Sequence, residues 1–335
     1  MLITRESLLR LARETVSQRI HAHPELVAVY LTGSLLTDDP LLGNTTDIDL
    51  VFVHPYLSEP QREVVPLTAE VHLDIKINPR FEYEHPRQLR LDPWLGPEMY
   101  APLRLYDGQH FFDFVQAGVR DKYDDPANAW GRAHRNLEHA RDLWSDLRSQ
   151  PPAPDQASPQ RLLKYMKAVS HACNCLAVLQ GRPLAERRFL TQFRSLATVS
   201  GHPELAASLL RLLGADRVDA SSLASLLPSW EADFLTAGSL PGADPRLHPG
   251  RCNYYLQGMR SQLQGAFPLD LLWPLLYTWS LAVAGLTTDA RHPWDQVCHQ
   301  WGLEGEYFAG QLDQLDAFLD QVTAILDALA LANGL

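Results

Sequence analysis

Two aspartates with the spacing of a metal site lie in the run 47-DIDLVFVH-54, which is otherwise mainly apolar. Side chains two residues apart on a β-strand project from the same face, so Asp47 and Asp49 would lie close together. Their carboxylates repel each other, and burying either one without a partner is costly unless a cation lies beside them. The spacing therefore predicts a strand that binds a cation.

A third carboxylate, Asp74, occupies the strictly alternating run 70-EVHLDIKI-77. The alternation predicts a second strand, with apolar side chains on one face and His72, Asp74 and Lys76 on the other. Three carboxylates without a cluster of thiols or imidazoles favour a hard ion such as Mg²⁺, which prefers oxygen ligands. We interpret His72 as a hydrogen-bonded neighbour of this site rather than as a ligand.

A glycine-serine pair, Gly33-Ser34, directly follows the apolar run 26-LVAVYLTG-33. Glycine at the end of a strand permits a sharp turn and a close backbone approach, and exposed amides with the Ser34 hydroxyl can bind phosphate. The pair means little alone. Together with the three aspartates it predicts a site that holds a nucleoside triphosphate on metal.

The set Gly33-Ser34, Asp47-Ile48-Asp49 and Asp74 resembles the signature of the polymerase β-like nucleotidyltransferase superfamily, over residues 27 to 77. In general layout the chain looks nearest to the small antibiotic-modifying (aminoglycoside-type) members. The resemblance implies an α+β fold, with a mixed β-sheet nucleotidyltransferase domain and flanking helices in residues 1–110. An all-α helical-bundle domain that binds substrate and nucleotide would follow in residues 111–335.

The resemblance also implies a mechanism and a set of ligands. Asp47, Asp49 and Asp74 would bind two Mg²⁺ ions, and Asp74 could help to deprotonate the attacking hydroxyl. The reaction would transfer a nucleoside monophosphate, with AMP from ATP as the first candidate, to a hydroxyl of a small molecule such as an aminoglycoside. The alternatives are transfer to RNA such as tRNA, transfer to a protein side chain, and a catalytically silent nucleotide-binding module.

One departure from the family pattern concerns the loop 35-LLTDDPLLGNTT-46, which should lie near the triphosphate. It carries two extra acids, Asp38 and Asp39. Either these acids point to solvent or they repel a second polyanion such as RNA. Other acids, in 121-DKYDDP-126 and 304-EGE-306, are candidates for binding a polycationic acceptor, although surface charge is the simpler interpretation of both.

A triphosphate also needs cationic side chains. In the helix expected from Pro159 to Gly181, Lys164 and Lys167 share a predicted polar stripe with His171 and Asn174, at spacings of three, four and three. Either these lysines reach the phosphates or the stripe is a solvated helix face. Lys76 is a further candidate for nucleotide binding, or else a partner of Asp74 on the same strand face. Arg187 and Arg188 are also candidates.

Helical patterns account for most of the remaining chain. Apolar residues at helical spacing predict an amphipathic helix over 4–20, and Asp125-Pro126 predicts the start of another helix. The proline-rich segment 150–160 predicts a loop or linker. The apolar run 268–286 carries Asp270 and Pro274 and predicts a buried core helix rather than a membrane span.

The final helix has a narrow apolar seam, which predicts packing either in the chain's own bundle or in a homodimer. The seam consists of Phe308, Leu312, Leu315, Leu319, Val322, Leu326 and Leu329.

Composition limits the classes of function. The 335 residues carry a formal charge of −11, which argues against broad binding to nucleic acids and suits a small cationic partner or a solvated surface. Four scattered cysteines predict buried reduced thiols. The first twenty residues lack the apolar core of a signal peptide, so we expect a cytoplasmic protein without a membrane anchor.

Overall fold

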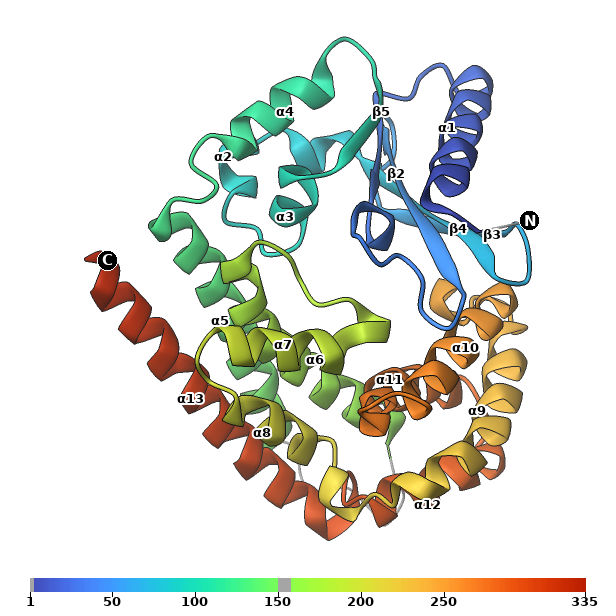
Figure 1. Cartoon of the computed structure of the whole chain (residues 1–335), viewed down its shortest axis with the longest axis vertical. Coiled ribbons are helices and arrows are strands. Elements are labelled where there is room, and N and C mark those ends of the chain that lie inside the picture. The colour runs from blue at the N-terminus through green and yellow to red at the C-terminus, as the bar shows by residue number, and fades with distance from the viewer. Residues whose placement is uncertain (1–2, 150–157) are drawn as a thin grey trace. The chain divides into compact units, whose positions relative to one another are not determined.

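The computed structural model describes residues 3–149 and 158–335. The chain forms two compact units, Met1–Asn128 and Ala129–Leu335. A β-sheet with several helices forms the first unit, and helices form the second (Figure 1). The chain is therefore an α+β protein, as the sequence predicts.

The sheet of the first unit is mixed and five-stranded, in the order β3-β4-β2-β1-β5. Strand β2 runs parallel to β4, whereas β1 pairs antiparallel with β2 and β5, and β3 pairs antiparallel with β4. Three strands follow the predicted runs, but the sequence patterns miss β3 and β5. The strands are β1 (Ala28–Thr32), β2 (Thr46–His54), β3 (Gln61–Pro66), β4 (Val71–Pro79) and β5 (Leu103–Asp107).

Helix α1 (Arg5–Ala22) packs on one face of the sheet (Figure 1). It begins with a capping box, in which Thr4 and Ser7 each accept the other's backbone N–H and so satisfy two donors at the helix start. Leu8 and Val16 of α1 are buried against the apolar residues of β2 and β4, including Leu50 and Ile75. This packing explains why the apolar alternation of both strands was visible in the sequence.

The opposite face of the sheet has its own apolar core, which includes Val51 and Val53 of β2 and Phe112. Asp47 and Asp49 precede these valines on the same face, because side chains alternate along a strand. The cover comes from short elements after β4. These are the 3₁₀ turn η2 (Arg80–Tyr83), α2 (Pro86–Leu89), α3 (Leu95–Tyr100) and α4 (Phe111–Arg120).

The second unit has one extensive apolar core, to which all of its α-helices contribute. These are α5 (Pro126–Ser149), α6 (Pro159–Ala177), α7 (Phe189–Val199), α8 (Glu204–Leu212), α9 (Leu223–Gly238), α10 (Cys252–Leu263), α11 (Leu272–Val283), α12 (His292–Gln300) and α13 (Phe308–Asn333).

Most of the predicted helices are confirmed. Pro126 and Pro159 each begin a helix. The second one ends at Ala177 and continues into the 3₁₀ turn η3 (Val178–Gln180), which Gly181 ends with a left-handed φ of 101°. The apolar run from 268 becomes a short 3₁₀ turn followed by the largely buried α11. Of the predicted linker, residues 150–157 lie outside the described residues.

The seam of α13 packs in the core of the helical unit, as one of the two interpretations predicts. All of its members are buried there except Leu329. The four cysteines are free and buried, which confirms the prediction of buried thiols.

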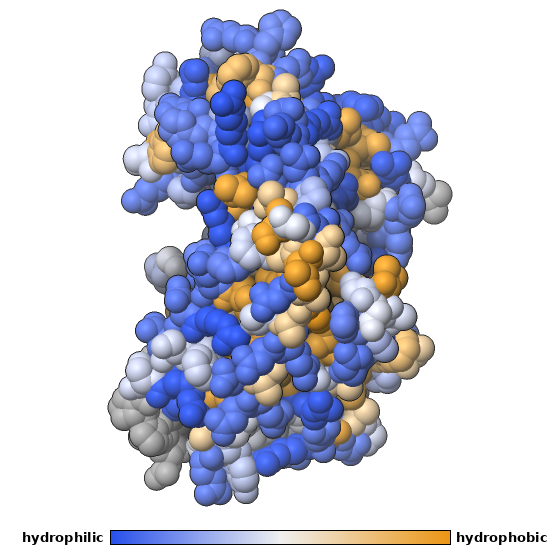
Figure 2. Space-filling model, turned by 90° about the vertical axis from the view of Figure 1, so that its left-hand side faces the viewer, coloured by the Kyte–Doolittle hydropathy of each residue, from blue (hydrophilic) through white to orange (hydrophobic). Residues whose placement is uncertain are grey.

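No helix in the described parts of the chain has both the length and the apolar character needed to cross a membrane. On the face drawn in Figure 2, hydrophilic residues predominate and hydrophobic residues gather in patches between them.

Candidate active site

The parallel pairing of β2 with β4 brings the predicted carboxylates together. Asp49 lies directly opposite Asp74, and Asp47 lies opposite His72. Directly paired residues share a sheet face, so all four side chains project from the face opposite α1. Asp47 and Asp74 are only 6% and 2% exposed, so their charges require compensation.

Three of these side chains form a cluster with the dimensions of a metal site. One ligand atom each from Asp47, His72 and Asp74 lies within 4.8 Å of the other two. The group includes His72, which the sequence suggested only as a neighbour, in place of Asp49. Two carboxylates fit a hard cation, whereas an imidazole nitrogen also suits transition metals.

The turn after β1 lies directly against Asp49. Gly33 has φ 77° and ψ −157°, a conformation that strongly favours glycine. A Cβ at this position would overlap Oδ2 of Asp49. The glycine is thus required both by its backbone conformation and by the close approach of a carboxylate.

Ser34 begins the 3₁₀ turn η1 (Ser34–Leu36), and its hydroxyl lies 3.4 Å from that of Thr46 at the start of β2. Thr46 Oγ1 donates a hydrogen bond of 2.9 Å to the Pro40 carbonyl. These contacts hold the loop after Gly33 against the strand that carries Asp47 and Asp49. Asp38 and Asp39 in this loop are exposed.

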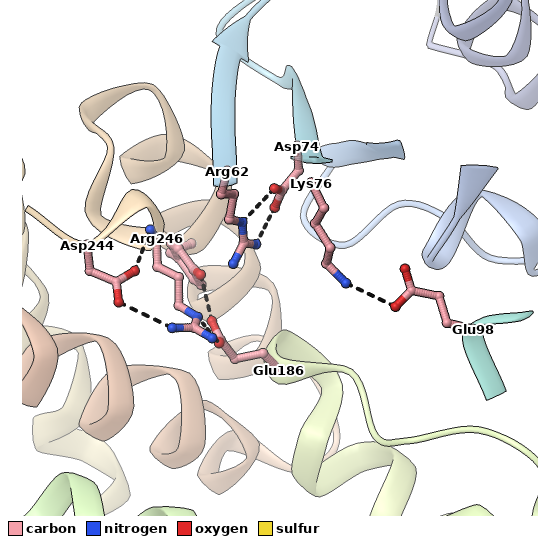
Figure 3. A network of polar contacts seen from close by, with 8 residues as sticks. Arg62, Asp74, Lys76, Glu98, Glu186, Asp244 and Arg246 are labelled. Carbon is pink, nitrogen blue, oxygen red and sulfur yellow. Dashed lines mark hydrogen bonds and ion pairs between the residues drawn. The ribbon is translucent and has the colours of Figure 1, made fainter. Parts of the chain in front are cut away.

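Arg62 of β3 is an unexpected member of the site. Its Nε donates to Oδ1 of Asp74 at 2.7 Å, and its Nη2 donates to Oδ2 (Figure 3). The guanidinium therefore binds both carboxylate oxygens in a bidentate ion pair, the strongest arrangement for such a pair. The side chain of Arg62 is 25% exposed and that of Asp74 only 1%.

The sequence offered little sign of Arg62. Its strand, 61-QREVVP-66, is half-exposed and ends in a proline, as edge strands commonly do. Arg62 pairs with Lys76 across the ladder and so lies diagonally beside Asp74 on the same face. Only the register between β3 and β4 reveals this contact.

Lys76 does not neutralise Asp74. Its Nζ lies 3.3 Å from Oε2 of Glu98 in α3, as Figure 3 shows. Pairing of Lys76 with Asp74, one of the two interpretations from the sequence, is replaced by the Arg62 contact. Lys76 nevertheless shares the sheet face of the carboxylates.

The candidate stripe on α6 is only partly a polar surface. Lys164 is paired with Asp146 of α5 at 2.7 Å, and Lys167 is exposed. His171 and Asn174, in contrast, are buried. The interpretation of the stripe as a solvated helix face is therefore wrong for these two residues.

The two buried residues have structural contacts. His171 Nδ1 lies 3.1 Å from Oδ1 of Asn136, and Asn174 Oδ1 accepts the Leu184 N–H. Burial, together with the charges of His139 and Lys167, lowers the pKa of His171 to about 4.

Arg187 is also buried, and its guanidinium donates to the Tyr254 carbonyl at 2.8 Å while lying over the Tyr254 ring. These contacts give it a structural role within the helical unit. Beside it, Glu186 accepts a hydrogen bond of 2.6 Å from the Tyr255 hydroxyl and pairs with Arg246 (Figure 3).

Glu304 corrects another expectation from the sequence. It was interpreted as surface charge, yet it is only 2% exposed and accepts the Ser158 N–H at 3.2 Å. Burial raises the pKa of Glu304 to about 7. The residue lies where α6 begins and does not belong to an exposed acidic patch.

Comparison with protein-family models gives no match for the chain, and comparison with curated proteins gives no significant match. The functional assignment therefore depends on the geometry of these residues.

Proposed function

We propose that this protein is a Mg²⁺-dependent nucleotidyltransferase that transfers a nucleoside monophosphate to a hydroxyl of a small molecule. AMP from ATP is the first donor to test. One observation carries the proposal: Asp47, Asp49 and Asp74 share one face of two adjacent parallel strands, with Asp49 and Asp74 in direct register. The glycine turn against Asp49 adds a backbone suited to phosphate.

The donor set fits a divalent cation. The close cluster of Asp47, His72 and Asp74 supplies oxygen ligands and one nitrogen, and Asp49 lies opposite Asp74. Bound Mg²⁺ would offset the charge of the triphosphate and activate the acceptor hydroxyl. In this proposal Asp47, Asp49 and Asp74 hold the ions, and a bound ion competes with Arg62 for the Asp74 carboxylate.

The phosphates would bind at the turn after β1. The Ser34 hydroxyl and the amides after Gly33 are donors at the end of β1. To bind phosphate, Lys76 would have to break its ion pair with Glu98, and Lys164 would have to break its ion pair with Asp146. Lys167 is exposed and needs no such exchange of a short ion pair, so it is the first lysine of α6 to test.

The proposed acceptor is a small molecule that carries hydroxyl groups and positive charge. The formal charge of −11 favours the approach of a cation over that of a polyanion such as RNA. Aminoglycosides have this chemistry and are the first class to test, with uncharged hydroxyl compounds for comparison.

The test is an incubation with ATP labelled at the α-phosphate, Mg²⁺ and a panel of aminoglycosides and lincosamides. We expect label on at least one acceptor, and loss of that label in Asp47→Asn/Asp49→Asn. Glu14→Gln, which changes an exposed carboxylate of α1, serves as the matched control. Labelling that survives the double substitution would exclude the proposed metal site.

A second candidate is a catalytically silent nucleotide-binding module. The ion pair between Arg62 and Asp74 favours this candidate, because the guanidinium is hydrogen-bonded to both Asp74 oxygens, which a catalytic metal ion would need as ligands. Calorimetry would then show ATP binding, and the labelling experiment would show no turnover on any acceptor.

The same labelling experiment tests the alternative acceptors, with tRNA added to the panel and self-labelling of the protein recorded.

A further inference from the structure

Arg62 and Lys76 are two cations that lie next to each other on the face of the sheet that carries the candidate active site. They are directly paired across the ladder between β3 and β4, so their side chains project from the same face as Asp74. Like charges directly opposite each other on two strands destabilise a sheet unless anions offset them. Two cations placed in this way suit a polyanion such as a chain of phosphates.

Each of the two cations is held by a carboxylate in this structure. Arg62 binds both oxygens of Asp74, and Nζ of Lys76 lies 3.3 Å from Oε2 of Glu98 (Figure 3). Asp74 also belongs to the cluster with the dimensions of a metal site. Arg62 would therefore lose its carboxylate when a divalent cation binds to that cluster, whereas the pair of Lys76 with Glu98 involves no ligand atom of the cluster.

Without Asp74, the guanidinium of Arg62 needs another anion. The Arg62 side chain is 25% exposed and that of Asp74 only 1%, so Arg62 lies between the buried carboxylate and solvent. A guanidinium binds phosphate oxygens through the same planar pair of N–H groups that it uses for a carboxylate. Because Arg62 contacts a proposed ligand of the ion, a phosphate bound to the same ion would lie within its reach.

The position of Arg62 complements that of the glycine turn. The turn follows β1, which borders β2 on one side, whereas β4 and then β3 lie on the other side of β2. A phosphate on the carboxylates of β2 and β4 would therefore receive backbone amides from the side of β1 and the guanidinium from the side of β3.

We propose that Arg62 is a further phosphate-binding residue, which Asp74 holds until a divalent cation displaces it. The inference rests on the proposed nucleotidyl transfer site and adds an order of events to it. The cation binds first, Arg62 leaves Asp74, and the guanidinium then binds the phosphates of the nucleotide. In the metal-free protein, the same ion pair neutralises the buried carboxylate and keeps the guanidinium from other anions.

The test is whether removal of Arg62 has opposite effects on metal and nucleotide. The full chain and Arg62→Gln are titrated with Mn²⁺, which prefers carboxylate oxygens as Mg²⁺ does and whose free concentration electron paramagnetic resonance measures. Each protein is then titrated by calorimetry, in saturating Mn²⁺, with α,β-methylene-ATP, which cannot be cleaved next to the α-phosphate. Arg62→Gln should bind Mn²⁺ at least about threefold more tightly and the nucleotide at least about tenfold more weakly.

Arg19→Gln is the matched control. Arg19 pairs at 2.7 Å with Glu63, the next residue of β3 after Arg62, but it does so from α1 on the opposite face of the sheet. This change should leave both affinities as they are. Arg62→Lys keeps the charge without the planar fork and should recover part of the nucleotide binding. A merely structural role of Arg62 would weaken both ligands together.

A second measurement releases Arg62 without any metal. In EDTA, Asp74→Asn should bind α,β-methylene-ATP at least about threefold more tightly than the parent, because a carboxylate no longer engages the guanidinium. The gain should disappear when Arg62→Gln is added to Asp74→Asn. A gain caused only by the lost negative charge would persist in the double variant.

Three results would overturn the proposal: Arg62→Gln binds the nucleotide like the parent, it binds Mn²⁺ no more tightly, or the double variant keeps the gain in EDTA. Melting temperatures identify a loss of both ligands caused by unfolding. In that case Arg62→Lys decides, and nucleotide binding equal to that of the parent would overturn the proposal.

Failure of this inference and failure of the proposed function give different patterns. Nucleotide binding that is insensitive to Arg62 rejects the inference alone. The expected pattern of binding without transfer to any acceptor supports the inference and rejects the reaction. A parent protein that binds no nucleotide in saturating Mn²⁺ rejects both.

Discussion

The backbone of Gly33 lies directly against the carboxylate of Asp49, so that a Cβ on Gly33 would overlap Oδ2. A turn that approaches a carboxylate this closely brings its amides to the place where a metal-bound phosphate would arrive. The same contact makes Gly33 one of the most restricted positions in the sheet unit.

Gly33→Ala should therefore reduce nucleotide transfer at least tenfold by displacing Asp49 or the turn. The positive φ of 77° adds strain of about 1–3 kcal/mol to the folded state. Gly201→Ala is the matched control, because Gly201 has φ 79° but open space around the missing Cβ. Transfer rates and urea unfolding of both variants separate the two effects: a similar drop in activity for both would show that the contact with Asp49 is unimportant.

Arg62→Gln should leave the buried Asp74 without its cation. We expect a loss of about 1–3 kcal/mol in unfolding free energy, less than for a fully buried pair because Arg62 is 25% exposed. Mg²⁺ should restore part of this loss, since a cation at Asp74 replaces the guanidinium.

The measurement is urea unfolding of parent and variant with and without Mg²⁺. Arg10→Gln, which removes an exposed pair with Glu14, is the control and should show little change in either condition. Equal stabilisation of parent and Arg62→Gln by Mg²⁺ would mean that the ion and Arg62 do not compete for Asp74.

The presence of His72 in the cluster leads to a prediction about metal selectivity. His72→Gln should retain Mg²⁺-supported transfer within a few-fold, because Mg²⁺ prefers the carboxylate oxygens. The same change should lower the affinity for Zn²⁺ at least tenfold, because Zn²⁺ binds imidazole well. Metal titrations by calorimetry test this, with Asp74→Asn expected to weaken both ions; unchanged Zn²⁺ affinity in His72→Gln would exclude the imidazole as a ligand.

Glu304 should make the stability of the helical unit depend on pH. Its pKa rises from 4.5 to about 7 on folding, so the folded state binds more protons between these values and stability falls as pH rises through them. Glu304→Gln keeps an acceptor for Ser158 and removes the charge. It should be more stable than the parent by about 3 kcal/mol at pH 8.5 and similar to it near pH 4.

Urea unfolding at several pH values measures this difference. The exposed neighbour Glu306 provides the control, since Glu306→Gln should shift stability little and equally at each pH. A constant difference between parent and Glu304→Gln would show that this carboxyl does not titrate in the expected range.

Local patterns in the sequence were sufficient for the elements that pack on α1. The alternation in β2 and β4 is regular because one face of each strand is fully apolar, and the same period places Asp47 and Asp49 together. Strands β3 and β5 escaped prediction because their side chains are mostly half-exposed, which weakens the alternation.

The sequence by itself determined which carboxylates share a strand face and where the chain must turn on glycine, because both follow from backbone geometry over a few residues. Only the tertiary structure decided that Asp49 pairs with Asp74 across the strands, that Arg62 forms an ion pair with Asp74, and that His171 and Glu304 are buried. Strand register and burial depend on packing between segments far apart in the chain, and no local period records them.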